Sequence, residues 1–145
     1  MTYWRLFYHI VWGTKNRLPL LDDERGKLLR QAFVEVAGER ETLIHAIGWM
    51  PDHVHLAVSI PPKVAVSDVV QRLKGVSSHR VNQSGGDAFK WQQDYGIVSF
   101  SESKLPTVVA YIQNQRAHHA DNTLIAALEH VRQPESLSNR IEYRP

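Results

Sequence analysis

Residues 50–60 read MPDHVHLAVSI, and this stretch decides the fold that the sequence predicts. Successive side chains of a β-strand point to opposite faces of the sheet. One face of this strand is entirely apolar and carries Val54, Leu56, Val58 and Ile60. The other face carries the imidazoles of His53 and His55. We therefore expect helices to cover the apolar face, and the two histidines to lie side by side on the opposite face.

The segments around this strand predict an α+β fold. Residues 41–50, ETLIHAIGWM, form a second strand, and Pro51 and Asp52 connect the two strands as a hairpin. Residues 3–14 and residues around 97–100, rich in aromatic and β-branched side chains, predict two further strands. Apolar spacing predicts three helices, over residues 24–40, 66–83 and 104–123. This order is ferredoxin-like (split β-α-β), so we expect an antiparallel sheet with helices on one face and a C-terminal, tyrosine-bearing helix.

The starts of the helices are predicted from capping chemistry. Asp22 or Asp23 is expected to cap the first helix, with Glu24 in its first turn. Ser67 is the expected cap of the second helix. Pro106 is expected in the first turn of the third helix.

Composition places the chain among ordinary globular domains. It has 145 residues, of which 43% are hydrophobic and 22% charged, enough for one domain with a hydrophobic core. The net charge of +2 is only weak evidence for a nucleic-acid partner. No apolar run is long enough to cross a membrane, and the first residues lack the order of a signal peptide, which favours the cytoplasm. With no cysteine, any metal must be held by histidine, carboxylate or amide ligands.

A second group of polar side chains lies in YIQNQ, residues 111–115. On a helix Tyr111 and Gln115 are four residues apart and share one face. Tyr111 offers a phenol oxygen, and Gln115 offers a carbonyl oxygen that can bind a metal. The neighbouring face is the expected packing stripe and carries Val108, Val109 and Ile112. Each motif is weak alone, because helical tyrosines usually lie at a core margin and His-x-His arises by chance among eight histidines.

The two motifs together predict phosphodiester chemistry. A phenol has a pKa near ~10, so tyrosine is a poor nucleophile at neutral pH unless the reaction helps it. A metal held by His53, His55 and Gln115 would polarise a phosphate and orient it for attack. Attack by Tyr111 would give a covalent phosphotyrosine and release a strand end. Because the bond energy is conserved, rejoining would need no ATP.

Four segments resemble the IS200/IS605-like single-tyrosine transposases of the His-hydrophobic-His kind, which include the REP-associated tyrosine transposases. MPDHVHLAVSI (50–60) is similar to the signature of this family, and YIQNQRAHH (111–119) to its tyrosine helix. HIVWGTKNRLPLL (9–21) is similar to the first strand and following turn, and WQQDYGIVSFS (91–101) to the strand before the tyrosine helix. The resemblance spans about residues 3–120, and four motifs in order are far more specific than any one.

The resemblance implies a function and a division of the chain. It implies nicking and joining of single-stranded DNA through a 5′-phosphotyrosine at Tyr111, with a free 3′-OH. It implies Mg²⁺ or Mn²⁺ held by His53, His55 and Gln115, a DNA partner that bears hairpins, and a homodimer in which the tyrosine helix can serve either subunit. The transposase domain would span residues 1–121. Residues 122–145 would form a partly helical tail that matches nothing in the family pattern.

Contacts with DNA are predicted from charged and aromatic side chains. The candidate phosphate-binding cations are Lys15, Arg17, Arg72, Lys74, Arg80, Lys90 and Arg116. The candidates for stacking on bases are Trp49, Trp91 and Tyr95. Asp52 is a candidate to orient His53 as a hydrogen-bond acceptor. His118 and His119 could assist the metal site or serve as polar residues at a helix end.

Three other functions compete with this interpretation. A two-histidine phosphoesterase needs two His-x-Ser/Thr motifs, but Leu56 follows His55 and no second motif is present. A non-catalytic nucleic-acid binder on a ferredoxin-like sheet would present aromatic residues on its central strands, where this chain has histidines. A host-serving relative that processes repeated hairpins would use the same chemistry, so the residues do not separate it from the enzyme of a mobile element.

Overall fold

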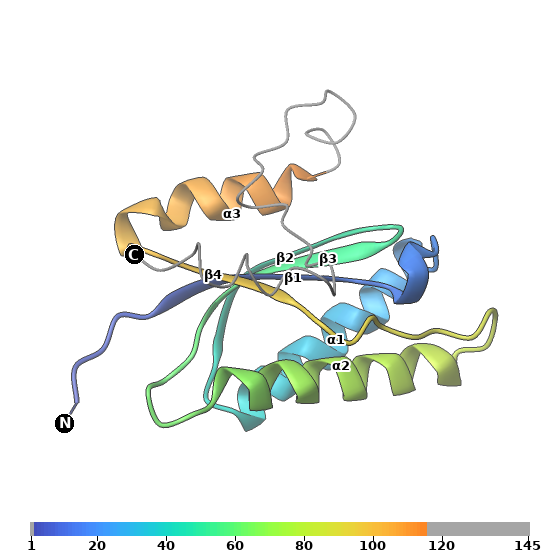
Figure 1. Ribbon diagram of the computed structural model, residues 1–145, viewed down its shortest axis with the longest axis horizontal. Coiled ribbons are helices and arrows are strands. Elements are labelled where there is room, and N and C mark those ends of the chain that lie inside the picture. Colours follow the sequence, from blue (N-terminus) through green and yellow to red (C-terminus); the bar gives the residue numbers. More distant parts are fainter. Residues whose placement is uncertain (1, 116–145) are drawn as a thin grey trace.

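A computed structural model describes residues 2–115, which form a four-stranded antiparallel sheet with helices on both faces (Figure 1). The strands are β1 (Phe7–Gly13), β2 (Leu43–Met50), β3 (His53–Ser59) and β4 (Gly96–Phe100). They lie in the order β2-β3-β1-β4, and every neighbouring pair is antiparallel. This is the ferredoxin-like arrangement, so the predicted fold class is confirmed.

The helices divide between the two faces of the sheet. The helices α1 (Asp23–Glu39) and α2 (Val66–Gln83) pack side by side under one face, whereas α3 (Leu105–Gln113) crosses the other (Figure 1). Two short 3-10 helices, η1 (Lys15–Arg17) and η2 (Glu102–Lys104), follow β1 and β4. Within the described range, no helix is long and apolar enough to cross a bilayer.

The helix boundaries confirm some of the capping predictions and correct others. The Asp22 side chain accepts a hydrogen bond from the backbone N–H of Arg25 at 2.8 Å and so caps α1. Pro106 lies in the first turn of α3, as predicted. The prediction that Ser67 caps α2 is wrong, because Ala65 is the N-cap and makes no side-chain bond. The Ala65 carbonyl, with Asp68 in the first turn, begins this helix without a capping hydroxyl.

The extent of the first strand and the third helix also differs from expectation. Strand pairing in β1 begins at Phe7, several residues later than predicted. The third helix ends at Gln113, because Asn114 leaves the helical conformation with φ −103° and ψ 20°. The predicted continuation to residue 123, and the tail over residues 122–145, lie outside the described residues.

The main core lies between the sheet and the pair α1–α2. Val54, Leu56 and Val58 of β3 are fully buried there, which confirms the predicted inward face of this strand. Trp12 of β1 fills the centre and packs edge-on against Phe33 of α1 at 5.7 Å between ring centroids. Burial of each such side chain stabilises the fold by roughly 1.5–3 kcal/mol. These contacts fix the strand that carries the two histidines.

A smaller apolar cluster fixes α3 on the opposite face. It joins Val108 and Ile112 of α3 to Ala46 of β2 and Ala57 of β3. The predicted packing stripe of this helix is therefore confirmed, with Val109 partly buried beside it. The small alanine side chains let α3 approach the sheet closely, so the C-terminal end of the helix comes to rest over the histidines.

Candidate active site

His53 and His55 lie on the sheet face that α3 crosses. Their side chains are buried, with exposed fractions of 3% and 0%. The two ring centroids are 5.1 Å apart, so the prediction that the imidazoles share one face is confirmed. His55 is paired with Val11 of β1 and Gly48 of β2, at the centre of the sheet, where neighbours on both sides hold the strand in place.

Asp52 orients the ring of His53. An oxygen of the Asp52 carboxylate lies 2.7 Å from Nδ1 of His53, and the same carboxylate pairs with Arg17 at 3.1 Å. Partial burial raises the pKa of Asp52, but its bonds to His53 and Arg17 outweigh this and leave the pKa below its ordinary value. The ionised carboxylate can only accept, so Nδ1 of His53 donates and the lone pair lies on Nε2.

Gln115 completes the group around His53. Its amide nitrogen lies 2.8 Å from Nε2 of His53, and the residue is only 2% exposed. Its carbonyl oxygen is buried and has no hydrogen-bond partner among the described residues. A buried carbonyl oxygen left unsatisfied costs about 1–3 kcal/mol, so this atom calls for a further partner.

The donor set around these residues fits a divalent cation. It offers two imidazole nitrogens and one amide oxygen, a mixed set that suits first-row divalent ions. No group of three or more His, Cys, Asp or Glu side chains within residues 2–115 is arranged to hold a metal. A cation here would therefore depend on Gln115 as the third protein ligand. Rotation of the side-chain amide by 180° exchanges its nitrogen and its oxygen, which occupy nearly the same space. After this rotation the oxygen faces the site.

Tyr111 lies beside the same group. It projects from α3, is 3% exposed, and its ring meets that of His55 edge-on at 6.3 Å between centroids. Gln115 lies just past Asn114, the residue at which α3 is interrupted, and is itself helical. The structure nevertheless brings Tyr111, Gln115 and both histidines together within one chain.

Gly48 is a site residue that the sequence reasoning missed. A Cβ atom there would lie 2.6 Å from the carbonyl oxygen of Ile112 and 2.8 Å from the amide oxygen of Gln115. Only glycine therefore lets the end of α3 come this close to β2. An isolated glycine inside a predicted strand is a recognised signal of close backbone approach, and it was available in the sequence.

His9 is the second residue that was missed. It lies on β1, is 2% exposed, and its Nε2 is 2.8 Å from Nδ1 of His55. The two rings are stacked, with centroids 4.9 Å apart and planes 15° apart. No short motif marks this residue, because its contact with His55 depends on the pairing of β1 with β3.

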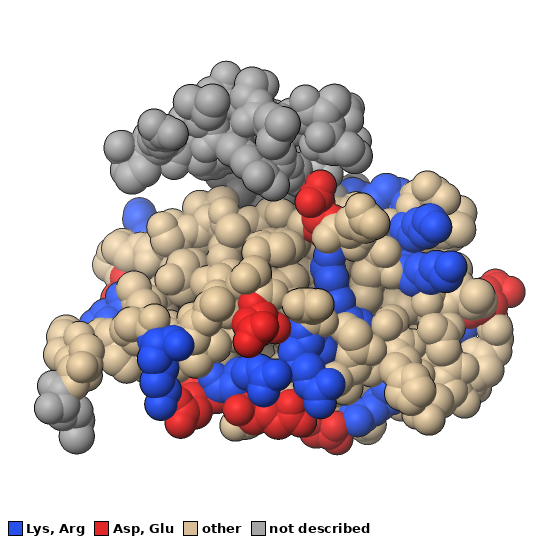
Figure 2. Space-filling model, turned by 60° about the horizontal axis from the view of Figure 1, so that its bottom comes forward, with Lys and Arg blue, Asp and Glu red and all other residues tan. Residues whose placement is uncertain are grey.

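Two of the predicted DNA-binding cations lie far from the histidines. Arg72 and Arg80 belong to α2, on the other side of the sheet. They form ion pairs with Glu39 and Glu35 of α1. Figure 2 shows this face with basic and acidic side chains interleaved, so it presents no continuous basic surface.

Lys74 has a structural environment of its own. Its ammonium group donates to the backbone carbonyls of Gln92, Gln93 and Asp94 at 2.8–3.0 Å. Burial lowers the pKa of Lys74 to about 8, with the nearby Asp94 carboxylate opposing the shift. Lys74 therefore holds the loop before β4 in place.

Arg116, another of the predicted DNA-binding cations, lies outside the described residues.

The remaining candidates gather near the His53 end of the sheet. Lys15 and Lys90 are exposed and adjacent, because the Lys15 N–H donates to the Lys90 carbonyl at 2.9 Å. Arg17 lies in the same turn, with a guanidinium nitrogen 3.4 Å from Nδ1 of His53. We call Lys15, Arg17 and Lys90 the basic rim. Through Arg17 it contacts the candidate site.

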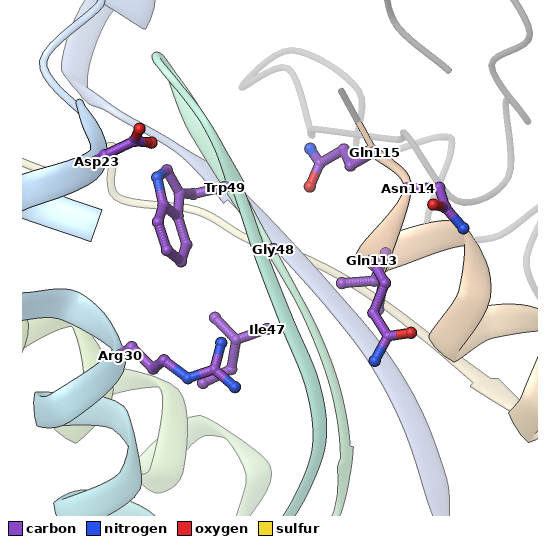
Figure 3. A pocket seen from close by; sticks show the side chains of 9 residues that line it. Asp23, Arg30, Ile47, Gly48, Trp49, Gln113, Asn114 and Gln115 are labelled. Carbon is purple, nitrogen blue, oxygen red and sulfur yellow. The ribbon is translucent and has the colours of Figure 1, made fainter. Parts of the chain in front are cut away.

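All three aromatic candidates pack against the main core, and the Trp91 indole N–H donates to Ser77 at 3.0 Å. Trp49 also lines a pocket that reaches Gln115. The Trp49 pocket has a volume of about 490 Å³ and lies at the edge of the sheet (Figure 3). Its lining residues are Asp23, Arg30, Ile47, Gly48, Trp49, Ile112, Gln113, Asn114 and Gln115.

Comparison with known proteins gives a consistent result. Residues 2–115 match the family model described as "Transposase IS200 like". The chain is 31% identical over 121 residues to the ISDra2 transposase TnpA of Deinococcus radiodurans, covering 77% of this chain and 85% of that protein. It is 30% identical over 92 residues to the transposase for insertion sequence element IS200 of Salmonella typhimurium, covering 63% of this chain and 60% of that protein.

Solved structures show the same fold. A crystal structure from Deinococcus radiodurans, assigned as a transposase, aligns with a TM-score of 0.63 and 28% identity, covering 79% of this chain and 95% of that one. A REP-associated tyrosine transposase bound to a REP hairpin aligns with a TM-score of 0.64 and 20% identity, covering 82% and 74%. At that identity the second likeness concerns the fold alone.

Proposed function

The chain belongs to the IS200-like transposase family, and from that premise we propose that it nicks and rejoins single-stranded DNA through a covalent link to Tyr111. In this proposal His53, His55 and Gln115 hold Mg²⁺ or Mn²⁺. The observation that carries it is the convergence, under α3, of one phenol, two imidazoles and one amide in a buried site. Nothing in the packing of the core requires four polar side chains at this place.

The proposed ligands are prepared by their neighbours. Asp52 accepts from Nδ1 of His53 and so turns the Nε2 lone pair toward Gln115. With its amide turned by 180°, Gln115 would direct its oxygen toward the cation. A divalent ion bound there supplies polarisation of a phosphate oxygen and shielding of the charge that develops during attack.

Tyr111 is the proposed nucleophile. Its phenol oxygen forms a bond to phosphorus as the bond from phosphorus to the 3′ oxygen breaks. The phenol gives up its proton and the departing 3′ oxygen takes up a proton. The products are a 5′-phosphotyrosine on the protein and a strand with a free 3′-OH. In the reverse sense, a 3′-OH attacks the phosphotyrosine, rejoins DNA and releases Tyr111. The bond energy stays in the phosphodiester throughout.

The proposed substrate is a single strand that carries a hairpin. The basic rim supports a path for the phosphate backbone past the His53 end of the sheet. One relative of the same fold was solved bound to a REP hairpin, which motivates the choice of hairpin-bearing DNA. The same chemistry would serve the movement of a mobile element or the processing of scattered host hairpins, and we propose that the protein acts as a homodimer.

A nicking assay tests this function. We expect hairpin-bearing single strands incubated with Mn²⁺ to yield a covalent protein–DNA adduct on a denaturing gel. Tyr111→Phe should abolish the adduct and preserve folding and DNA binding, since the ring that packs in the site remains. Tyr95→Phe, at a tyrosine of the main core, is the matched control and should retain the adduct.

Other outcomes of the assay favour other functions. An adduct at full rate from Tyr111→Phe would show that another residue is the nucleophile. Cleavage that persists in EDTA would favour the two-histidine phosphoesterase. Metal-independent binding with no covalent product from the unaltered protein would favour a non-catalytic nucleic-acid binder.

A further inference from the structure

We infer that His9 is a positioning residue for His55: it accepts a hydrogen bond from Nδ1–H of His55 and so fixes Nε2 as the nitrogen that carries the lone pair. The inference rests on the proposed metal site and adds a residue that the ligand set does not include. His9 itself touches neither the metal nor the DNA in this account. Its effect is exerted through the ring of His55.

The geometry allows only two arrangements of the proton between these rings. Nε2 of His9 and Nδ1 of His55 are 2.8 Å apart, and both residues are buried. One nitrogen must donate and the other accept. If neutral His55 donates from Nδ1, its Nε2 is free of a proton and can bind a metal. If His9 donates instead, neutral His55 carries its proton on Nε2 and cannot bind a metal through that nitrogen.

The sheet holds His9 in position to accept this bond. His9 is paired with Ala57 of β3 on one side and with Val98 of β4 on the other. Its ring is stacked at 15° on that of His55, which limits rotation of both rings. A central strand with neighbours on both sides therefore supplies a fixed acceptor.

The two proposed histidine ligands thus have acceptors of different kinds. His53 has the Asp52 carboxylate, which lies in a partly exposed turn and pairs with Arg17. His55 is fully buried, where a carboxylate would carry a large desolvation cost. The neutral imidazole of His9 provides an acceptor there without adding a buried charge.

Two substitutions at His9 separate the hydrogen bond from the packing. His9→Phe keeps a ring of similar size and removes the acceptor. His9→Gln restores an amide oxygen near the position of Nε2. His45→Phe is the matched control, because His45 is also a strand histidine but bonds to Ser59 at 2.8 Å, away from the site.

The test measures the tautomer and the metal affinity, not DNA cleavage. In long-range ¹H–¹⁵N spectra of the metal-free protein, we expect His55 to be protonated on Nδ1. By calorimetry, His9→Phe should weaken Mn²⁺ binding by about 10- to 100-fold, the usual effect of losing a partner that orients a ligand. His9→Gln should recover most of this loss, and His45→Phe should bind Mn²⁺ like the unaltered protein.

Two results would overturn the inference: protonation of His55 on Nε2 in the unaltered protein, or unchanged Mn²⁺ affinity in folded His9→Phe. If His9→Phe does not fold, the inference is still tested by the tautomer of His55 in the unaltered protein and by the Mn²⁺ affinity of His9→Gln. Neither measurement uses the DNA adduct. The role of His9 and the role of Tyr111 can therefore fail separately.

A second inference comes from the pocket that Trp49 lines (Figure 3). We propose that this pocket binds a nucleobase of the DNA strand, next to the phosphate that is cut; this too rests on the proposed function. Its volume of about 490 Å³ lies within the usual range for small-molecule sites. Figure 3 shows that the pocket surrounds the edge strand β2, with Trp49 and Arg30 on one side of the strand and Gln113 and Asn114 on the other.

The lining of the pocket suits a nucleotide. The Trp49 indole is held against α1, where a Cβ on Gly26 would lie 2.0 Å from the ring, so the aromatic wall is fixed before binding. Arg30 is exposed and forms no ion pair within the described part of the chain. An aromatic ring, a guanidinium and side-chain amides are the groups that bind single-stranded bases and their phosphates.

The pocket and the candidate metal site share one residue. Gln115 lines the pocket and also lies 2.8 Å from His53. A base bound in the pocket would therefore contact the residue that we propose as the third metal ligand. This continuity separates the pocket from an unrelated surface depression.

Single abasic substitutions along the DNA test this proposal. Binding is measured by fluorescence anisotropy in the Tyr111→Phe background, so that no strand is cut. Trp49→Leu should weaken binding by about 5- to 150-fold, the equivalent of losing one stacked base. In the Tyr111→Phe protein, DNA with one abasic position beside the nick should bind more weakly by a similar factor. When Trp49→Leu is also present, the same abasic position should have little further effect on binding.

The controls distinguish a specific pocket from general charge. Arg30→Gln should weaken binding, whereas Arg72→Gln should not, because Arg72 is paired with Glu39 on the far side of the sheet. If every abasic position weakens Trp49→Leu as much as the parent, the base does not lie against Trp49 and the proposal is wrong. Should Trp49→Leu fail to fold, the same comparison is made with Arg30→Gln.

Discussion

At the scale of single residues, hydrogen bonds decide which atom each side chain presents to the candidate site. Asp52 lies against Nδ1 of His53, and His9 lies against Nδ1 of His55. Both rings can therefore offer Nε2 to the same space. Gln115 borders that space with its side-chain amide, whose nitrogen lies 2.8 Å from Nε2 of His53. We therefore expect these partners to matter for metal binding as well as the proposed ligands.

The amide of Gln115 can be tested directly. We expect Gln115→Ala to lower Mn²⁺ affinity, because the site loses one of three protein ligands, and Gln115→Glu to retain binding through a carboxylate oxygen. Calorimetry on the DNA-free protein is the measurement. Gln113→Ala is the control, since Gln113 lines the neighbouring pocket and is not a proposed ligand. Equal affinity in Gln115→Ala and the unaltered protein would remove Gln115 from the ligand set.

At the scale of elements, the position of α3 on the sheet creates the candidate site. Gly48 and two alanines of β2 and β3 let the helix approach, and its apolar stripe holds it there. The alternation in β3 and the stripe on α3 could be read from the sequence, because each is local. The contact of His9 with His55 could not, since it depends on which strands are paired and in what register.

Substitution of Gly48 tests this close approach. Gly48→Ala should destabilise the fold by about 1–3 kcal/mol, the usual cost of overpacking, and should weaken Mn²⁺ binding because the added methyl group displaces Gln115. Urea unfolding and calorimetry measure the two effects.

Gly38 of α1 provides the matched control for this experiment. A Cβ there meets no atom within 4 Å, so Gly38→Ala should leave metal binding unchanged. It should stabilise the helix by about 0.5–1 kcal/mol. If Gly48→Ala binds Mn²⁺ like the unaltered protein, α3 does not need the space that this glycine leaves.

At the scale of the whole molecule, one face of the sheet forms the main core and the other carries the candidate site. The face under α1 and α2 supplies the main core, and its outer surface carries charges of both signs (Figures 1 and 2). The face under α3 carries the polar site. The split β-α-β order and the proposed ligands could be predicted from the sequence. The end of α3 at Gln113 could not, because helical spacing in the sequence continues past it.

The arrangement also predicts that the site is formed within one chain. Tyr111 lies beside His55 of the same chain, so each chain should hold a complete site. A mixture of His55→Ala and Tyr111→Phe proteins should therefore remain inactive, because neither chain has both groups. Recovery of adduct formation in the mixture would show that the working site combines the tyrosine of one subunit with the histidines of another.

Peptide mapping of the covalent adduct identifies the nucleophile. The unaltered protein is incubated with a hairpin-bearing single strand and Mn²⁺, digested with protease and nuclease, and analysed by mass spectrometry. We expect a nucleotide attached through its 5′ phosphate to Tyr111. Attachment at any other residue, or attachment through a 3′ phosphate, would contradict it.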